Sequence, residues 1–154
     1  MPTPSLFTAV PPRGRERLLA RSRQVSFPAG TRLFDEGDRA QRLWVITSGS
    51  LTLRARVPGR LLTTVGTLGP GDLTGWSALI PPHVREFGAY TVGWLNAREF
   101  DAADLHDLCD ADPPLACAIH RYLATTVAHR LRTTRQRLIE VYGPYGHDSA
   151  RQAG

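Results

Sequence analysis

Hydrophobic residues follow a strand-like period through the middle of this chain. Between positions 25 and 100 they alternate with polar residues in short runs, and most runs end at a turn that contains glycine or proline. Runs 51–57 and 61–65 flank a Pro-Gly turn and predict a β-hairpin, whereas 43–46 is apolar throughout and predicts a strand buried on both faces. Short strands at intervals of about ten residues indicate an antiparallel sandwich or small barrel. We interpret Trp44 and Trp94 as part of its core.

The period becomes helical on both sides of this region. Residues 13–23 predict a short, very basic helix that uses Leu18 and Leu19 as its apolar contact. Residues 101–109 predict another helix directly after the last strand. The fold class is therefore mainly β with flanking helices.

A much longer helix is predicted over residues 113–142. Asp112 is suited to cap its first turn, and Gly143 with Pro144 is expected to end it. One face carries an apolar stripe at steps of three or four: Leu115, Ile119, Leu123, Val127, Leu131, Thr134, Leu138 and Val141. Because a small barrel cannot cover so long a stripe, we expect the excess to be buried against a second copy of the helix. The sequence thus predicts a homodimer through 113–142.

Glycine and proline are most frequent in the stretch 69–92. Gly75 opens a short apolar run, which Pro81 and Pro82 end before it can become a full helix. A short helical turn with free amide groups, followed by an arginine such as Arg85, is the chemistry of a small anion site. This stretch is the candidate binding site.

Composition sets limits on this picture. A chain of 154 residues is long enough for one domain, which we place at 13–142 between predicted flexible tails at 1–12 and 143–154. The net charge of +5 is the balance of 19 arginines, with no lysine, against 14 acidic residues. No recognition helix follows the long helix, so we expect no sequence-specific DNA binding. Neither a signal peptide nor an apolar run long enough for a membrane span is visible, which predicts a cytoplasmic protein without membrane contact.

The sequence lacks the patterns of an enzyme. There is no nucleophile elbow and no Walker loop. Barrels of this kind can hold metals on clustered histidines, but of the five histidines only His83 lies outside the predicted helices and tails. We therefore expect no catalytic residues and no metal site.

Four glycine-bearing segments together carry a resemblance to a known family. They read FPAGT at 27–31, LFDEGD at 33–38, LWVITSG at 43–49 and LGPGD at 68–72. This series resembles the cyclic-nucleotide-binding domain of bacterial catabolite-activator-type (Crp/Fnr-like) regulators over roughly residues 14–142. The resemblance implies an antiparallel jelly-roll β-barrel with a short N-terminal helix. It also implies a phosphate-binding cassette and a long C-terminal helix that both dimerises and covers the ligand.

The family pattern carries over to specific positions. It implies ligand contacts at Gly75, Trp76, Ser77, Ala78, Arg85 and Thr134, and a ligand of the cyclic AMP or cyclic GMP type.

Two positions in the cassette depart from that pattern. The family has a glutamate after the first glycine, which holds the ribose hydroxyl, but here Trp76 takes its place. An indole donates one hydrogen bond and accepts none. Glu86 and Phe87 follow Arg85 where small residues are expected, and Glu86 is placed to neutralise Arg85 directly.

Two hypotheses follow. In the first, the protein is a non-enzymatic sensor of a small molecule, and its dimer helix signals to another regulatory protein. In the second, Trp76 and an Arg85–Glu86 contact close the pocket. The fold then binds no nucleotide and serves as a constitutive dimeric protein-interaction module.

Overall fold

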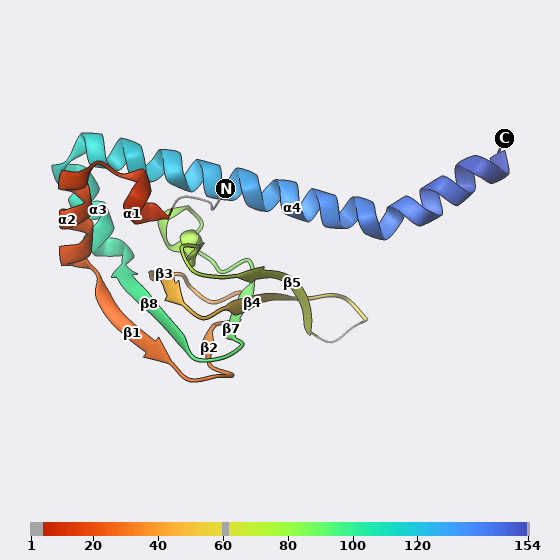
Figure 1. The fold of residues 1–154 in the computed structure, drawn as a ribbon, viewed down its shortest axis with the longest axis horizontal. Helices are drawn as coiled ribbons and strands as arrows, with labels where there is room; N and C mark the ends of the chain where they lie inside the picture. Colours follow the sequence, from red (N-terminus) through yellow and green to blue (C-terminus); the bar gives the residue numbers. More distant parts are fainter. Residues whose placement is uncertain (1–4, 60–61, 154) are drawn as a thin grey trace. The chain divides into compact units, whose positions relative to one another are not determined.

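The computed structural model describes residues 5–59 and 62–153 of the chain (Figure 1). The chain forms two compact units, Met1–Tyr122 and Leu123–Gly154. The first unit contains all the strands that are described, together with the candidate cassette.

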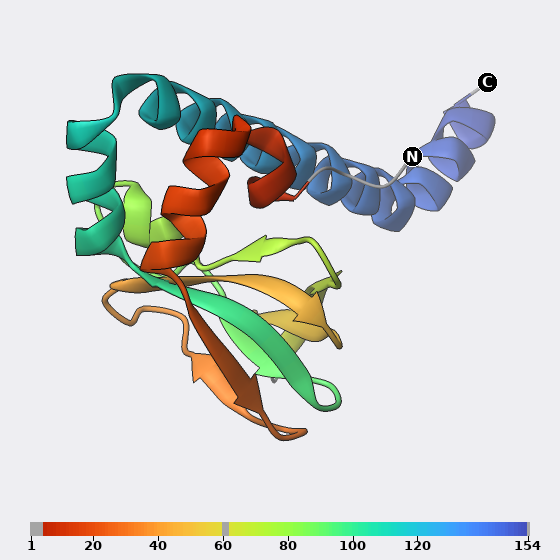
Figure 2. The same ribbon diagram turned by 60° about the vertical axis from the view of Figure 1, so that its left-hand side comes forward.

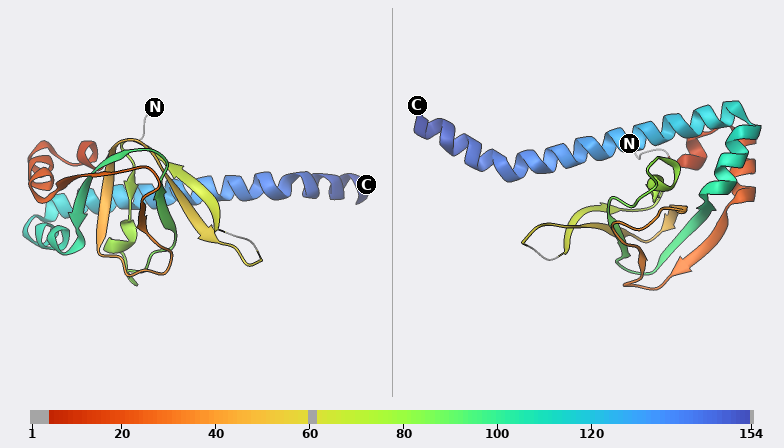
Figure 3. Two further views of the ribbon diagram at one scale, coloured as in Figure 1. Left: turned by 90° about the horizontal axis from the view of Figure 1, so that it is seen from below. Right: turned by 180° about the vertical axis from the view of Figure 1, so that it is seen from behind.

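Eight strands are found in the described residues, and all their pairings are antiparallel. They are β1 (Arg23–Phe27), β2 (Arg32–Phe34), β3 (Arg42–Ser48), β4 (Leu51–Arg56), β5 (Leu62–Leu68), β6 (Leu73–Thr74), β7 (Gly88–Thr91) and β8 (Leu95–Asp101). One sheet has the order β1-β8-β3-β6 and the other β2-β7-β4-β5. Figure 2 shows them as two layers, and Figure 3 shows the same strands from below and from behind. The predicted antiparallel, mainly β fold is confirmed.

The core lies between the two sheets. Its buried side chains are Ile46, Leu51, Leu53, Leu68, Ala89 and Leu95. Strand β3 is buried from Leu43 to Ile46, as its continuous apolar run predicted, and Trp44 is 5% exposed. The interpretation of Trp94 as a core residue was wrong, because its side chain is 61% exposed. Strand β7 ends at Thr91, so Trp94 lies in the turn before β8 and not in a strand.

The helices of the first unit gather at one end of the barrel (Figure 2). They are α1 (Leu6–Ala9), α2 (Pro12–Arg21) and α3 (Ala102–Ala111), and a short 3₁₀ turn, η1 (Trp76–Leu79), lies in the cassette. In α2, Leu18 is fully buried as predicted, but Leu19 is 40% exposed. Helix α2 packs against α1 and α3. Leu19 lies about 100° further around the helix than Leu18, at the edge of the packed face.

Part of the predicted N-terminal tail is ordered as helix α1. Ser5 caps this helix, since its hydroxyl accepts a hydrogen bond from the Thr8 amide. Leu6 is 1% exposed and holds α1 against the fold. Residues 1–4 of the same predicted tail lie outside the described residues.

The last helix, α4, spans Pro113–Ala153. Asp112 caps it as predicted, because its Oδ1 accepts a hydrogen bond of 3.1 Å from the Leu115 amide. The helix continues through Gly143 and Pro144, where we expected it to end. A proline removes one amide donor and bends a helix locally, but the turns on either side can remain helical. No described helix is both long and apolar enough to span a membrane.

Candidate functional site

The cassette begins at Gly75, and its geometry requires a glycine there. The residue has a left-handed backbone with φ of 85°. A Cβ at this position would lie 2.9 Å from the Arg42 carbonyl oxygen and 3.1 Å from the Leu43 Cα. Gly75 therefore lets the cassette lie directly against strand β3 before η1 begins.

Arg85 ties the cassette to the same strand. Its Nη1 donates a hydrogen bond of 2.9 Å to the Gly75 carbonyl, and its Nη2 donates one of 2.6 Å to the Arg42 carbonyl. The backbone of Arg85 pairs with the turn after β2, through Asp38 and Gly37. The residue is 4% exposed, so the guanidinium belongs to the interior of the protein.

The Arg85 guanidinium is also enclosed by aromatic rings. Its central carbon lies 4.2 Å from the Phe34 ring centre and 5.6 Å from that of Trp44, and the two rings stack on each other at 5.7 Å. Ring faces attract a cation. The Nε atom is buried and has no hydrogen-bond partner among the described residues.

This environment changes the acidity of Arg85. Burial lowers its pKa to about 10, and the nearby Asp38 carboxylate opposes part of that shift. The group still carries its charge at neutral pH. Among the described ion pairs none involves Arg85, so carbonyl dipoles and ring faces are its direct contacts.

The expected contact between Arg85 and Glu86 is not present. Glu86 is exposed and forms no ion pair with Arg85 in the part of the chain that the structure describes. Arg85 is buried, whereas Glu86 lies in the bend that follows it, on the surface. The hypothesis that Glu86 neutralises Arg85 was wrong.

The other cassette residues differ in burial. Ser77 is 8% and Ala78 2% exposed, whereas Trp76 is partly buried and lies outside the hydrophobic core cluster. The Ala78 carbonyl is 3.1 Å from Nδ1 of His83, so this histidine contacts the end of the cassette. The structure thus brings Gly75 and Arg85 into direct contact and places the three residues 76–78 on the adjoining turn.

Thr134, the remaining predicted ligand contact, lies in α4 within the second unit. Its side chain is exposed. A role for Thr134 at the ligand stays a prediction.

A buried carboxylate beside the cassette was missed in the sequence. Glu99 is 5% exposed, and its Oε2 accepts a hydrogen bond of 2.9 Å from the Trp44 indole. Its Oε1 accepts one from Arg23 and lies 3.9 Å from the Arg42 guanidinium. The Arg42 carbonyl also accepts a hydrogen bond from Arg85. Strand β3 therefore contacts both the cassette and the charged cluster of Glu99, Arg23 and Arg42. The sequence carried one signal of this buried carboxylate: Glu99 is charged, yet it lies two residues after Ala97 on the side of β8 that faces inward.

Metal ligation has no support in the geometry of the described residues. Among them, no group of three or more histidine, cysteine or acidic side chains is arranged to hold a metal ion.

Known proteins resemble this chain both in sequence and in fold. Residues 24–112 match the cyclic nucleotide-binding domain family. A CRP-like cAMP-activated global transcriptional regulator of Mycobacterium tuberculosis is 29% identical over 136 residues, which cover 88% of this chain and 59% of the relative.

Two solved structures illustrate the likeness in fold. The c-di-GMP responsive global regulator CLP of Xanthomonas campestris superposes with a TM-score of 0.74 at 26% identity, covering 83% of this chain and 63% of that chain. The catabolite activator protein of Thermus thermophilus gives a TM-score of 0.72 at 27% identity, covering 88% and 62%. This chain therefore spans less than two thirds of the length of all three regulators.

Proposed function

The chain belongs to the cyclic nucleotide-binding domain family, and we propose that it is a non-enzymatic, cytoplasmic sensor of a small anionic ligand. The ligand is of the cyclic nucleotide class, and its phosphate meets Arg85 at the cassette. The related regulators are described as cAMP-activated and as c-di-GMP responsive, which fits a ligand of this class.

The observation that carries this proposal is the buried charge of Arg85. A guanidinium in the interior without a carboxylate partner is costly, as the lowered pKa of Arg85 reflects. A phosphate in contact with it supplies the missing negative charge, and charge-assisted hydrogen bonds are roughly twice as strong as neutral ones. The unpartnered Nε is one available donor for such a bond.

Arg85 is also suited to transmit binding. Its two Nη atoms now hold the carbonyls of Gly75 and Arg42, so a phosphate that competes for either donor loosens the cassette from β3. We propose that this exchange is the step by which the ligand alters the protein.

Trp76 gives the proposal a distinctive specificity. A glutamate at that position accepts a hydrogen bond from the ribose 2′-hydroxyl, which an indole cannot do. We therefore propose that this cassette distinguishes poorly between a cyclic ribonucleotide and its 2′-deoxy form.

The second unit supports a further part of the proposal, a homodimer through residues 113–142. Its exposed apolar side chains are Leu131 at 69%, Leu138 at 57%, Ile139 at 45%, Val141 at 60% and Tyr142 at 64%. Leu131 and Leu138 are one heptad apart, the spacing of a helix–helix seam. A dimer buries this surface, and a partner regulatory protein then reads the arrangement of the helices.

A second candidate function has one specific observation in its favour. Both Nη atoms of Arg85 already have acceptors, so Arg85 holds the cassette on β3 without a ligand. In this alternative the domain binds no nucleotide and acts as a constitutive dimeric interaction module.

Thermal unfolding with a panel of cyclic AMP, cyclic GMP, cyclic di-GMP and non-cyclic AMP separates the two candidates. A ligand at a hundred times its dissociation constant stabilises the folded state by about 2.7 kcal/mol. For a chain of this size that corresponds to a rise in Tm of roughly 5 to 10 °C. A Tm that no cyclic nucleotide raises refutes the sensor and favours the interaction module.

A further inference from the structure

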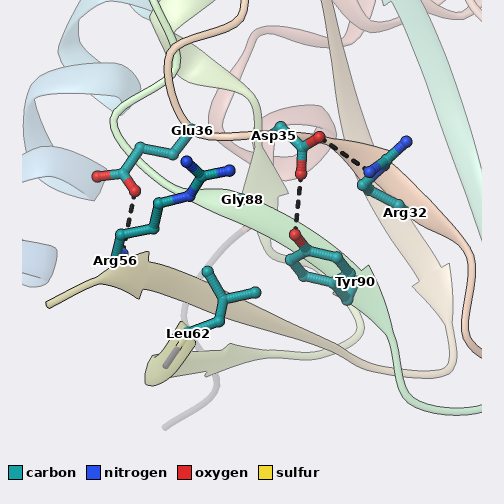
Figure 4. A pocket seen from close by; sticks show the side chains of 7 residues that line it. All are labelled: Arg32, Asp35, Glu36, Arg56, Leu62, Gly88 and Tyr90. Carbon is teal, nitrogen blue, oxygen red and sulfur yellow. Dashed lines mark hydrogen bonds and ion pairs between the residues drawn. The ribbon is translucent and has the colours of Figure 1, made fainter. Parts of the chain in front are cut away.

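A separate pocket lies on the outer face of the β2-β7-β4-β5 sheet (Figure 4). Its lining residues are Arg32, Asp35, Glu36, Arg56, Leu62, Gly88 and Tyr90. Ala89 points into the core, so its neighbours Gly88 and Tyr90 face away from it. Gly88 and Tyr90 lie near the end of the stretch 69–92, but none of the predicted ligand contacts, Gly75, Trp76, Ser77, Ala78, Arg85 and Thr134, lines this pocket. The pocket is therefore distinct from the proposed nucleotide site.

Tyr90 forms a fixed wall of this pocket. Its hydroxyl donates a hydrogen bond of 2.9 Å to Asp35, and the Arg54 guanidinium carbon lies 4.7 Å from its ring centre. Gly88 makes room for the ring, since a Cβ there would lie 2.9 Å from Cε2 of Tyr90. The Tyr90 ring is therefore held by Asp35 at its hydroxyl and by Arg54 at its face, and it packs over Gly88, which has no side chain.

Two of the four charged groups in the lining are already paired with each other. Arg32 forms an ion pair of 3.1 Å with Asp35, whose second oxygen accepts the Tyr90 hydroxyl. The other two charged groups, those of Arg56 and Glu36, form no ion pair with each other in the described structure.

Arg56 and Glu36 keep spare hydrogen-bonding capacity. Glu36 accepts one hydrogen bond of 3.0 Å from the Arg56 backbone amide, through Oε2. Within the described residues the Arg56 guanidinium has no hydrogen-bond or ion-pair partner, and Oε1 of Glu36 has none either. The pocket thus presents one available cation and one available carboxylate, beside the apolar side chain of Leu62 and the Tyr90 ring (Figure 4).

We propose that this pocket binds a zwitterion, a free α-amino acid with an apolar side chain. The α-carboxylate pairs with the planar guanidinium of Arg56, which matches a carboxylate with two parallel hydrogen bonds. The α-ammonium group donates to Glu36, and the apolar side chain packs against Leu62 and Tyr90.

Charge and size favour this ligand class over others. The lining holds two arginines and two carboxylates, so its charges balance and a simple anion or cation leaves one of the free groups unmatched. The pocket volume is ≈ 350 Å³, near the lower end of the range of about 300–1,000 Å³ for small-molecule sites. That volume fits a molecule the size of an amino acid.

Calorimetric titration of the full chain with L-leucine tests the proposal, with leucinamide and N-acetyl-leucine as matched probes that lack one charge each. We expect saturable binding of leucine, and binding at least about tenfold weaker for either derivative. Saturation that is absent at concentrations on the order of 10 mM, or equal affinity for all three probes, overturns the proposal.

Variants of the lining residues show whether leucine binds in this pocket. Arg56→Gln and Glu36→Gln should each weaken leucine binding about tenfold, and Gly88→Ala should abolish it by displacing the Tyr90 ring. Arg39→Gln, an exposed arginine outside the pocket, is the control and should bind as the wild type does. Leucine binding that survives both Arg56→Gln and Glu36→Gln contradicts the assignment.

Discussion

Gly75→Ala offers a direct test of the contact between the cassette and strand β3. The substitution adds a single methyl group at a residue with φ of 85°, where an L side chain is strained by roughly 1–2 kcal/mol. The added Cβ also lies 2.9 Å from the Arg42 carbonyl oxygen and 2.9 Å from Nη1 of Arg85. Since the Arg42 oxygen is backbone of a buried strand, the cassette must move, and Arg85 loses one of its hydrogen bonds.

Substitutions at two nearby glycines separate the backbone strain from the close contact of the added Cβ. Gly71 has φ of 88° but its Cβ would meet nothing closer than the Ser5 side chain at 3.9 Å, so Gly71→Ala reports strain alone. Gly69 has neither a positive φ nor a neighbour within 4 Å, and Gly69→Ala should be neutral or stabilise by up to about 1 kcal/mol. The lost hydrogen bond adds a further 1–3 kcal/mol or so for Gly75→Ala.

Urea unfolding measures the three variants against the wild type. We expect destabilisation by about 1–2 kcal/mol for Gly71→Ala and about 2–5 kcal/mol for Gly75→Ala. If Gly75→Ala costs no more than Gly71→Ala, the close approach of the cassette to β3 is refuted.

Three further predictions concern other parts of the molecule. Trp44→Phe removes the indole donor to buried Glu99 and should destabilise the fold by about 1–3 kcal/mol in urea unfolding. Trp94→Phe, in an exposed turn, is the control and should stay within about 0.5 kcal/mol of the wild type. Equal effects of the two substitutions would contradict the buried hydrogen bond between Trp44 and Glu99. The pKa of Tyr90 is raised above 10.0, chiefly by burial and by its hydrogen bond to Asp35, so the folded state favours the neutral phenol. The stability that Tyr90 contributes is present below pH 10.0 and is lost as the pH rises further. Above pH 10.0 the Tm of Tyr90→Phe should therefore fall less steeply than that of the wild type. Identical Tm profiles for the two proteins would show that Tyr90 does not cause this loss of stability. The proposed dimer predicts a dimeric mass by sedimentation at micromolar concentration and a monomer for the double variant Leu131→Glu, Leu138→Glu; a monomeric wild type rules it out.

Much of the barrel could be predicted because the pattern of apolar residues records whether one or both faces of a strand are buried. The continuous apolar run in β3 and the hairpin of β4 and β5 are of this kind, and both are found in the structure. Helix α1 could not be found this way, since a helix of four residues is too short to show a period. Its order comes from the Ser5 cap and the burial of Leu6, which are tertiary effects.

The candidate site was predictable in position but not in its contacts. The glycine and proline pattern together with the family resemblance indicated Gly75 and Arg85, and the two residues do touch. The acceptor at Arg42, however, lies 43 residues from Arg85, and Glu99 lies 55 residues from Trp44. The pairing of strands brings these residues together, and the local pattern carries no record of it. For the same reason the pattern suggested Glu86, the nearest carboxylate in sequence, as the partner of Arg85.

We propose that the buried charge of Arg85 receives the phosphate of a cyclic nucleotide. Calorimetric titration of the wild type, Arg85→Gln and the exposed control Arg39→Gln with cyclic AMP and its 2′-deoxy form tests it most directly. We expect saturable binding to the wild type and to Arg39→Gln, with similar affinities for the two nucleotides, and a loss of affinity of at least about 100-fold for Arg85→Gln. Unchanged affinity in a folded Arg85→Gln variant, or no binding to the wild type, would contradict it.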